Sequence, residues 1–243
     1  MYGFNFEMNM YYHLKYRINP EMKMIHLLEE NHLLLLMLQH FEIDFRVGDS
    51  TIAQLCKEYD ISENLFIRIA NLYSGVRVAN NTSFSKKDVL RVINFLKNSH
   101  TYYRSDKYPQ IRNYIFQLKQ NHPDKELKLL EQFFDEYFAE VLEHLNYEDT
   151  IAFPYFIALL ENKENTAAST NYSSDEYSEH HTDIELKLKD LKSLLLKHLK
   201  INDDWMLRRQ LLFALYELEY DLYIHSLIEE TILIPAGIGI ENE

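Results

Sequence analysis

The chain of 243 residues is 47% hydrophobic and 26% charged, the composition of an ordinary globular protein with room for one large domain or two modest ones. Its formal net charge of −13 argues against sequence-independent binding of nucleic acid, since such binding depends on clustered Lys and Arg. Five glycines and five prolines are too few for the turns of a β-rich fold, so the sequence predicts an all-α protein.

Two features bear on where the protein works. Cys56 is the only cysteine, which excludes an intramolecular disulfide and favours a reducing compartment. The first 20 residues lack the apolar core of a signal peptide, and the longest aliphatic stretch, 33–38, is far too short to cross a bilayer. The sequence therefore predicts a cytoplasmic protein that does not enter the membrane.

The N-terminal third is predicted to form a small helical domain. Residues 1–19 show no clear period and are expected to be a lead-in segment. Apolar side chains then recur at threes and fours through residues 20–41, which is the pattern of an amphipathic helix, and Gly48 permits a turn after it. We place this domain at residues 20–75 and a polar linker at 76–86.

Two further helices of this domain have residues suited to cap their N-termini. Ser50 or Thr51 can cap a helix that runs through Cys56. Ser62 can cap the next helix, which runs through Leu72.

Residues 87–238 are predicted to form an antiparallel bundle of four helices. The first leads to His100 and is expected to be interrupted or bent near Pro109. The polar stretch 161–176 is expected to be a loop after the second. The second runs from about Lys125 to Pro154, with one face formed by Leu129, Phe133, Tyr137, Val141, His144 and Glu148. The third carries His181, Ile184, Leu188, Leu191 and Leu195. The fourth carries Leu211, Leu215, Leu218, Leu222, His225 and Glu229, and stops near Pro235-Ala-Gly237.

A repeat with a constant shift of 81 positions runs through this bundle. It maps His100 onto His181, His144 onto His225, Glu148 onto Glu229 and Pro154 onto Pro235. A single H-x-x-x-E would be weak evidence, because solvated pairs on helix surfaces have the same spacing. Here both motifs share an acid-Thr-Ile segment and a proline, and the repeat preserves His and Glu more faithfully than apolar residues. This pattern indicates ligands; a structural duplication without metal is the alternative.

Two adjacent histidines compete for the position on the third helix. Both His180 and His181 lie near the start of its apolar ladder, but the 81-residue shift and the spacing by threes and fours select His181. The remaining histidines have no counterpart in the other half of the repeat, and we interpret them as surface or structural residues: His13, His26, His32, His40, His122 and His198.

The repeated side chains suit a pair of iron ions. Residues i and i+4 share one face of a helix, so each H-x-x-x-E can offer one nitrogen and one oxygen to the bundle axis. Imidazole with carboxylate favours iron, whereas a structural zinc site would prefer cysteine. We predict a non-haem di-iron centre, bridged by oxo and carboxylate groups and with open positions for O2, NO or peroxide. Its ligands are expected to be His100, His144, Glu148, His181, His225 and Glu229.

These motifs resemble the hemerythrin-like di-iron domain of the Repair of Iron Centres family. In that family each H-x-x-x-E precedes an apolar segment that ends in proline, as do residues 151–154 and 232–235 here. Oxygen-carrying hemerythrins have one more histidine on the third helix, where this chain has Tyr177 and Glu185 on either side of His181. The chain therefore resembles the type with four histidine and two glutamate ligands.

The resemblance extends to residues 24–75. Here Phe41-Glu-Ile-Asp-Phe45 and Thr51-Ile-Ala-Gln-Leu-Cys-Lys-Glu-Tyr59 match the small helical domain that precedes the bundle in this family. The family usually has two adjacent cysteines just after the first of these stretches, where this chain has Arg46-Val47. The thiol chemistry of that pair is therefore absent, and Cys56 is expected to be a small core residue.

The resemblance implies a protein of the stress response that helps to repair iron–sulfur clusters after nitrosative or oxidative damage. It would act through labile iron, or through NO or O2 at open iron positions, with iron–sulfur cluster proteins as partners. The alternative is a sensor of O2 or NO that signals through its N-terminal domain. A third interpretation takes residues 51–72 as a helix-turn-helix, but Lys57 and Arg68 stand there among acidic residues, which disfavours DNA. None of these interpretations assigns a catalytic residue.

Overall fold

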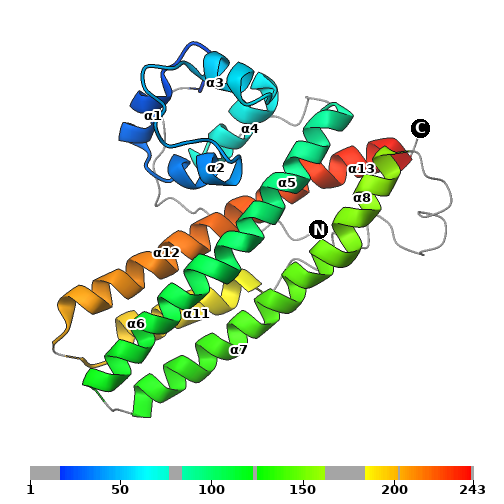
Figure 1. Ribbon diagram of the computed structural model, residues 1–243. Coiled ribbons are helices and arrows are strands. Elements are labelled where there is room, and N and C mark those ends of the chain that lie inside the picture. The colour runs from blue at the N-terminus through cyan, green and yellow to red at the C-terminus, as the bar shows by residue number, and fades with distance from the viewer. Residues whose placement is uncertain (1–16, 77–83, 123–124, 162–183, 202, 242–243) are drawn as a thin grey trace. The chain divides into compact units, whose positions relative to one another are not determined.

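The computed structural model describes residues 17–76, 84–122, 125–161, 184–201 and 203–241, without the side chains of 184–186 and 241. These ranges consist of helices, turns and one isolated backbone bridge, so the all-α prediction is confirmed for them. No helix in them is both long and apolar enough to span a membrane. The contacts that residues make with one another in space divide the chain into two compact units, Met1–Phe84 and Ser85–Glu243 (Figure 1).

The N-terminal unit contains the helices α1 (Met24–Glu30), α2 (Leu34–His40), α3 (Ile52–Glu58) and α4 (Glu63–Tyr73). The predicted caps are confirmed. Thr51 and Gln54 form a capping box at the start of α3, and Ser62 Oγ accepts a hydrogen bond from the Leu65 N–H at the start of α4. The turn predicted at Gly48 is also present, with a left-handed φ of 53° that favours glycine.

The predicted helix through residues 20–41 is wrong, because two helices occupy this range. The chain leaves α1 at Asn31 and resumes in α2. The buried Asn31 side chain accepts a hydrogen bond from the Leu33 N–H and donates one to the Tyr73 carbonyl. The Asn31 amide thus bonds to two backbone groups, the Leu33 N–H and the Tyr73 carbonyl, and these bonds compete with a continuous helix. The apolar spacing is the same on both sides of the break, so the sequence pattern alone did not reveal it.

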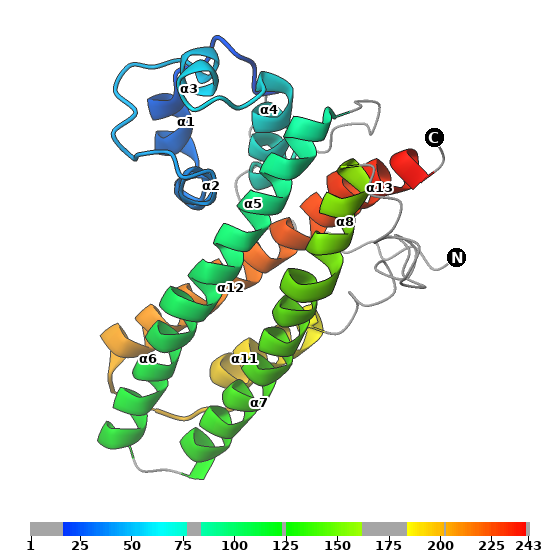
Figure 2. The ribbon, with the colours of Figure 1, turned by 45° about the vertical axis from the view of Figure 1, so that its right-hand side comes forward.

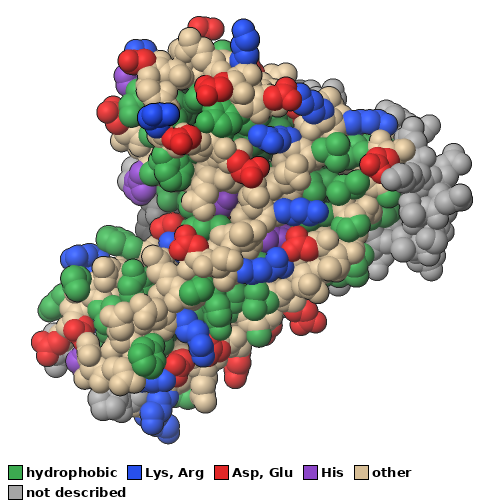
Figure 3. Space-filling view, viewed as in Figure 1, with side chains coloured by type: hydrophobic (Ala, Val, Ile, Leu, Met, Phe, Trp, Pro, Cys, Tyr) green, Lys and Arg blue, Asp and Glu red, His purple; other side chains and the backbone are tan. Residues whose placement is uncertain are grey.

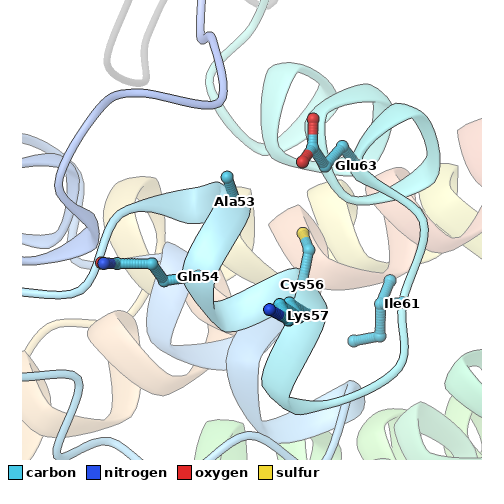
Figure 4. A pocket seen from close by; sticks show the side chains of 6 residues that line it. All are labelled: Ala53, Gln54, Cys56, Lys57, Ile61 and Glu63. Atoms are coloured by element: carbon cyan, nitrogen blue, oxygen red, sulfur yellow. The ribbon is translucent and has the colours of Figure 1, made fainter.

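Cys56 is a core residue of this unit, as predicted, with 2% of its surface exposed. It lines a shallow hollow together with Ala53, Ile61 and Glu63 (Figure 4). Burial, and then the negative charge of Glu63, raise the pKa of the thiol to about 12. A thiol with this pKa stays protonated near neutral pH and is therefore a poor nucleophile.

We expect the folded protein to resist thiol modification. A disulfide reagent such as DTNB, applied near neutral pH, should label only a small fraction of the chains in the time that it labels the unfolded chain completely. The liberated chromophore measures both reactions. Complete labelling of the folded protein at the rate of the unfolded chain would show that Cys56 is accessible and easily ionised.

The C-terminal unit consists of helical rods that lie side by side (Figures 1 and 2). The first rod is α5 (Lys86–Tyr102), the π-helical turn η1 (Tyr103–Lys107) and α6 (Tyr108–Asn121); the second is α7 (Lys125–Tyr147), the π turn η2 (Glu148–Ala152) and α8 (Phe153–Leu160). The third is α11 (Ile184–Lys197), and the fourth is α12 (Trp205–Ile228), the π turn η3 (Glu229–Leu233) and α13 (Ile234–Glu241). The first rod contacts the second and fourth, and α11 contacts α7 and α12, so the rods enclose one core.

The core of this unit follows the predicted pattern except on α7. Tyr137 and Val141 are buried there as expected, but Leu129 and Phe133 are 52% and 37% exposed. An α-helix has 3.6 residues per turn, so a row of steps of four drifts off the core face after several turns. On α11 and α12 the predicted core positions with described side chains are all buried: Leu188, Leu191, Leu195, Leu211, Leu215, Leu218 and Leu222.

The helices do not stop at their prolines. The stop predicted near Pro235-Ala-Gly237 is wrong, because α13 continues to Glu241, and α8 continues in the same way beyond Pro154. Each of these helices follows a π turn in which the carbonyl of Glu148 or Glu229 accepts from the N–H five residues later. A proline ring clashes with the carbonyl four residues before it in a regular α-helix, and the wider turn relieves this clash. The interruption expected near Pro109 is likewise a π turn, η1, directly before α6.

Candidate metal centre

The structure brings five of the six predicted ligands together inside the C-terminal unit. They come from three rods: His100 from α5, His144 from α7, His225 from α12, and Glu148 and Glu229 from the first positions of η2 and η3. The two π turns therefore begin at the two carboxylates that the repeat relates, and π turns commonly mark functional positions. The sixth predicted ligand, His181, lies outside the described residues, as do His180 and Tyr177.

Glu148 is the centre of this group. Its Oε2 lies 3.0 Å from Nε2 of His100 and 3.6 Å from Nε2 of His225. Its Oε1 lies 2.9 Å from Nε2 of His144. Nε2 of His225 is also 3.2 Å from Oε1 of Glu229. Both carboxylates and His100 are fully buried, so one buried carboxylate faces three imidazole nitrogens.

His100, Glu148 and His225 can hold a metal ion, because one ligand atom of each lies within 4.8 Å of the other two. The Nε2 atoms of His100 and His225 are buried, and neither makes a hydrogen bond of good geometry within the described part of the chain. Buried polar atoms nearly always have such partners, since leaving them without one is costly. A cation among these atoms would satisfy both nitrogens.

The charges of the group also favour a cation. Burial alone would raise the pKa of Glu148, but its contacts with His100, His144 and His225 hold that pKa well below its usual value. Burial alone would lower the pKa of His225, but the charges of Glu229 and Glu148 raise it to about 10. The two carboxylates thus stabilise positive charge at this position, whether an imidazolium or a metal ion carries it.

Polar partners hold the outer nitrogens of two of the imidazoles. Nδ1 of His100 lies 2.9 Å from Asp149 Oδ1, and because a carboxylate only accepts, this nitrogen carries the proton. Nδ1 of His225 lies 2.8 Å from Ser99 Oγ, which donates its own proton to the Leu96 carbonyl at 2.7 Å and therefore accepts from the imidazole. In their neutral forms both rings thus present a bare Nε2 to the centre of the site, as metal coordination requires.

Removing Asp149 should weaken metal binding although no ligand is lost. Asp149 is itself fixed by Arg104, whose Nη1 lies 2.7 Å from Oδ2. Loss of a partner that orients a ligating histidine costs about 10- to 100-fold in metal affinity. We expect a loss of this size for Asp149→Ala in a titration with ferrous iron. The control Asp135→Ala breaks the more exposed ion pair with Arg112 and should bind iron like the wild type. Equal affinities of Asp149→Ala and the wild type would show that Asp149 does not orient His100.

Of the two residues that hold the outer nitrogens of the imidazoles, Asp149 and Ser99, only Asp149 had a signal in the sequence. An acidic residue follows the ligand glutamate in both halves of the repeat, as Asp149 and Glu230, and this conserved spacing could have indicated a role beside the ligands. Ser99 had no such signal, because a serine before a histidine is unremarkable and only the fold brings it to His225. Of the other described histidines, His40 is buried in α2 of the N-terminal unit, and His122 of the C-terminal unit lies 2.8 Å from Asp204.

Comparisons with known proteins do not place the chain in a family, so the assignment of a metal site rests on this geometry and on the repeat. No protein-family model matches the chain, and no curated protein matches it.

Proposed function

We propose that the C-terminal unit is a hemerythrin-like four-helix bundle with a di-iron centre, and that the protein helps to repair iron–sulfur clusters damaged by nitrosative or oxidative stress. The observation that carries this proposal is the meeting of Glu148 with three imidazoles, from three rods, where the charges favour a cation. The repeat adds His181 as the counterpart of His100. The resemblance of the motifs to the Repair of Iron Centres family supplies the function.

The donor set supports iron as the metal. Imidazole and carboxylate without thiolate suit iron, and Glu148 lies between histidines from three rods, where a bridging carboxylate would stand. Six protein ligands shared by two ions would leave coordination positions open. Bound iron would supply exchangeable ferrous ions and a place for NO, O2 or peroxide. The chain itself would bury the ions and orient their imidazoles through Asp149 and Ser99.

A repair assay tests the function separately from the metal site. A dehydratase whose iron–sulfur cluster has been destroyed by NO would be incubated with a thiol, sulfide and the iron-loaded protein, and its recovered activity measured over time. We expect faster recovery than with the same amount of ferrous salt. The iron-free protein and Glu148→Gln should add nothing to the salt. Recovery no faster than with the salt alone, in a sample shown to contain iron, would refute repair and leave the metal site standing.

A gas sensor is the alternative, and the division of the chain into two compact units is the observation that favours it. A sensor would need its N-terminal unit to respond to the gas. Hydrogen exchange over residues 24–75, measured with and without NO, distinguishes the two functions, because repair by iron release needs no such response.

Nucleic-acid binding ranks last among the functions that we considered. Of the two basic residues on α3 and α4, Arg68 is buried and Lys57 is exposed. A single exposed basic side chain on these two helices would bind a phosphate backbone only weakly. On the face of the molecule drawn in Figure 3, Lys and Arg side chains are interspersed with Asp and Glu.

A further inference from the structure

A row of polar residues leads along α12 away from the candidate metal centre. Glu217, Asp221, His225 and Glu229 follow one another at steps of four, so they share one side of the helix. Asp221 is only 1% exposed although it is not among the predicted ligands. The side chain of Glu217, one turn further on, is 36% exposed. A buried carboxylate is costly unless it is well paired, so Asp221 needs an explanation.

Two adjacent tyrosines on the first rod face these carboxylates. The hydroxyl of Tyr103, which is completely buried, donates to Asp221 Oδ2 at 2.9 Å. The hydroxyl of Tyr102, which is 4% exposed, donates to Glu217 Oε1 at 2.6 Å. The centroids of the two rings are 5.6 Å apart. Each phenol therefore has its own proton acceptor, and the outer acceptor reaches solvent.

Tyr103 also touches the proposed metal ligand. Its ring lies edge-on to the ring of His225, with centroids 6.0 Å apart. Electron transfer slows steeply with distance, so contact with a ligating imidazole is a favourable position for an electron donor. The outer tyrosine is held as well, since the buried Lys107 lies 5.6 Å from the Tyr102 ring and 2.8 Å from Glu217.

The second half of the repeat has this arrangement and the first half does not. The counterpart of Asp221 at the 81-residue shift is Glu140, which is exposed and pairs with Lys187. A buried carboxylate one turn before the ligating histidine is therefore no requirement of the helix or of the ligand geometry. Its presence on α12 coincides with the phenol of Tyr103.

We propose that Tyr103 is a one-electron donor to the iron centre and that Tyr102 passes an electron to the Tyr103 radical from a reductant at the surface such as ascorbate. In this second step Tyr102 gives its electron to Tyr103 and its proton to Glu217, and Tyr103 recovers its own proton from Asp221. Ascorbate then reduces Tyr102, whose proton returns from Glu217, and releases one proton to the solvent.

This inference rests on the proposed iron site, and the oxidant of its first step is hydrogen peroxide. One peroxide takes one electron from a ferrous ion, one from Tyr103 and two protons from the solvent, and leaves as two water molecules. The Tyr103 O–H bond breaks, the electron passes through His225, and the proton goes to Asp221 Oδ2. The other products are a neutral tyrosyl radical, protonated Asp221 and a ferric ion.

The surroundings of Tyr103 favour this coupled step. Tyr103 is completely buried, and its hydroxyl already donates to Asp221 Oδ2 at 2.9 Å, so the phenolic proton has an acceptor in place when the electron leaves. The oxidant then oxidises Tyr103, which can be reduced again, and not the imidazoles that bind the metal.

Rapid-freeze electron paramagnetic resonance of the iron-loaded, full-length protein tests the proposal, with iron content measured on every sample. After mixing with a small excess of peroxide, the wild type should show a tyrosyl radical. Tyr103→Phe should lose this signal at unchanged iron content. Tyr102→Phe should form the radical but restore Tyr103 more slowly when ascorbate is present. Asp221→Asn should form it more slowly, because an amide is a far weaker base than a carboxylate.

A matched control lies on the same rod. Tyr108 also pairs with an aspartate, its hydroxyl lying 3.2 Å from Asp135 Oδ1, and Tyr108→Phe should keep the full radical signal. Iron-loaded wild type without a radical, or Tyr103→Phe with the wild-type signal, would overturn the proposal. Wild type that binds no iron would refute the proposed function and this inference together. Iron without a tyrosyl radical would refute this inference alone. Should Tyr103→Phe fail to fold, slower radical formation in Asp221→Asn supplies the same test.

Discussion

Glu148→Gln is expected to lower the affinity for iron by at least about 100-fold, since loss of a mere partner of a ligand already costs 10- to 100-fold. Glutamine has nearly the same shape as glutamate but no charge, and its amide nitrogen cannot bind a cation. Glu148 meets His100, His144 and His225 at 3.0, 2.9 and 3.6 Å, so the substitution disturbs the contacts of all three histidines at once.

Two measurements separate this effect from misfolding. Circular dichroism should show the same helical content in Glu148→Gln and the wild type, because the side-chain volume is kept. Iron titration should then show the loss of affinity. Glu143→Gln is the matched control, since Glu143 lies on the same rod but is exposed. Glu148→Gln with wild-type affinity would exclude Glu148 as a ligand, and an equal loss in Glu143→Gln would make the effect nonspecific.

Iron should also raise the melting temperature of the protein by roughly 8–16 °C. A ligand that binds only the folded state at about 1,000 times its Kd contributes about 4 kcal/mol, and each kcal/mol raises the melting temperature of a chain of this size by about 2–4 °C. The ion would replace the mutual contacts of the buried His100, Glu148 and His225 with coordination bonds. Differential scanning calorimetry of iron-free and iron-loaded samples measures the shift.

The same Glu148→Gln variant is the control for this shift. It should melt at nearly the same temperature with and without iron, because it no longer holds the metal. A wild-type shift of less than a few degrees at saturating iron would mean that the metal binds the folded and unfolded chains alike, or does not bind at the buried group.

The sequence predicted the elements of the fold better than their limits. Helical spacing and caps such as Thr51 and Ser62 are local properties, so they could be found without a structure. The break at Asn31 depends on a hydrogen bond to Tyr73, which is 42 residues away in the chain. The continuation of α13 past Pro235 depends on a π turn, which no single residue specifies.

The candidate site was predictable where the repeat marked it. The shift of 81 positions selected His100, Glu148 and His225 from among many acids and histidines, and the fold brings these three together. The residues around them were not marked. Ser99 and Tyr103 reach His225 only because α5 and η1 lie against α12, and a serine or a tyrosine beside a histidine carries no distinctive pattern in the sequence.

Iron stoichiometry tests the central claim most directly. The purified full-length protein would be titrated anaerobically with ferrous iron, freed of unbound metal and analysed for iron, then exposed to O2 while its near-ultraviolet absorption is recorded. We expect about two iron atoms per chain, since the repeat supplies the set of imidazole and carboxylate ligands twice, and an absorption band of an oxo-bridged diferric pair. Well under one iron atom per chain would contradict the account.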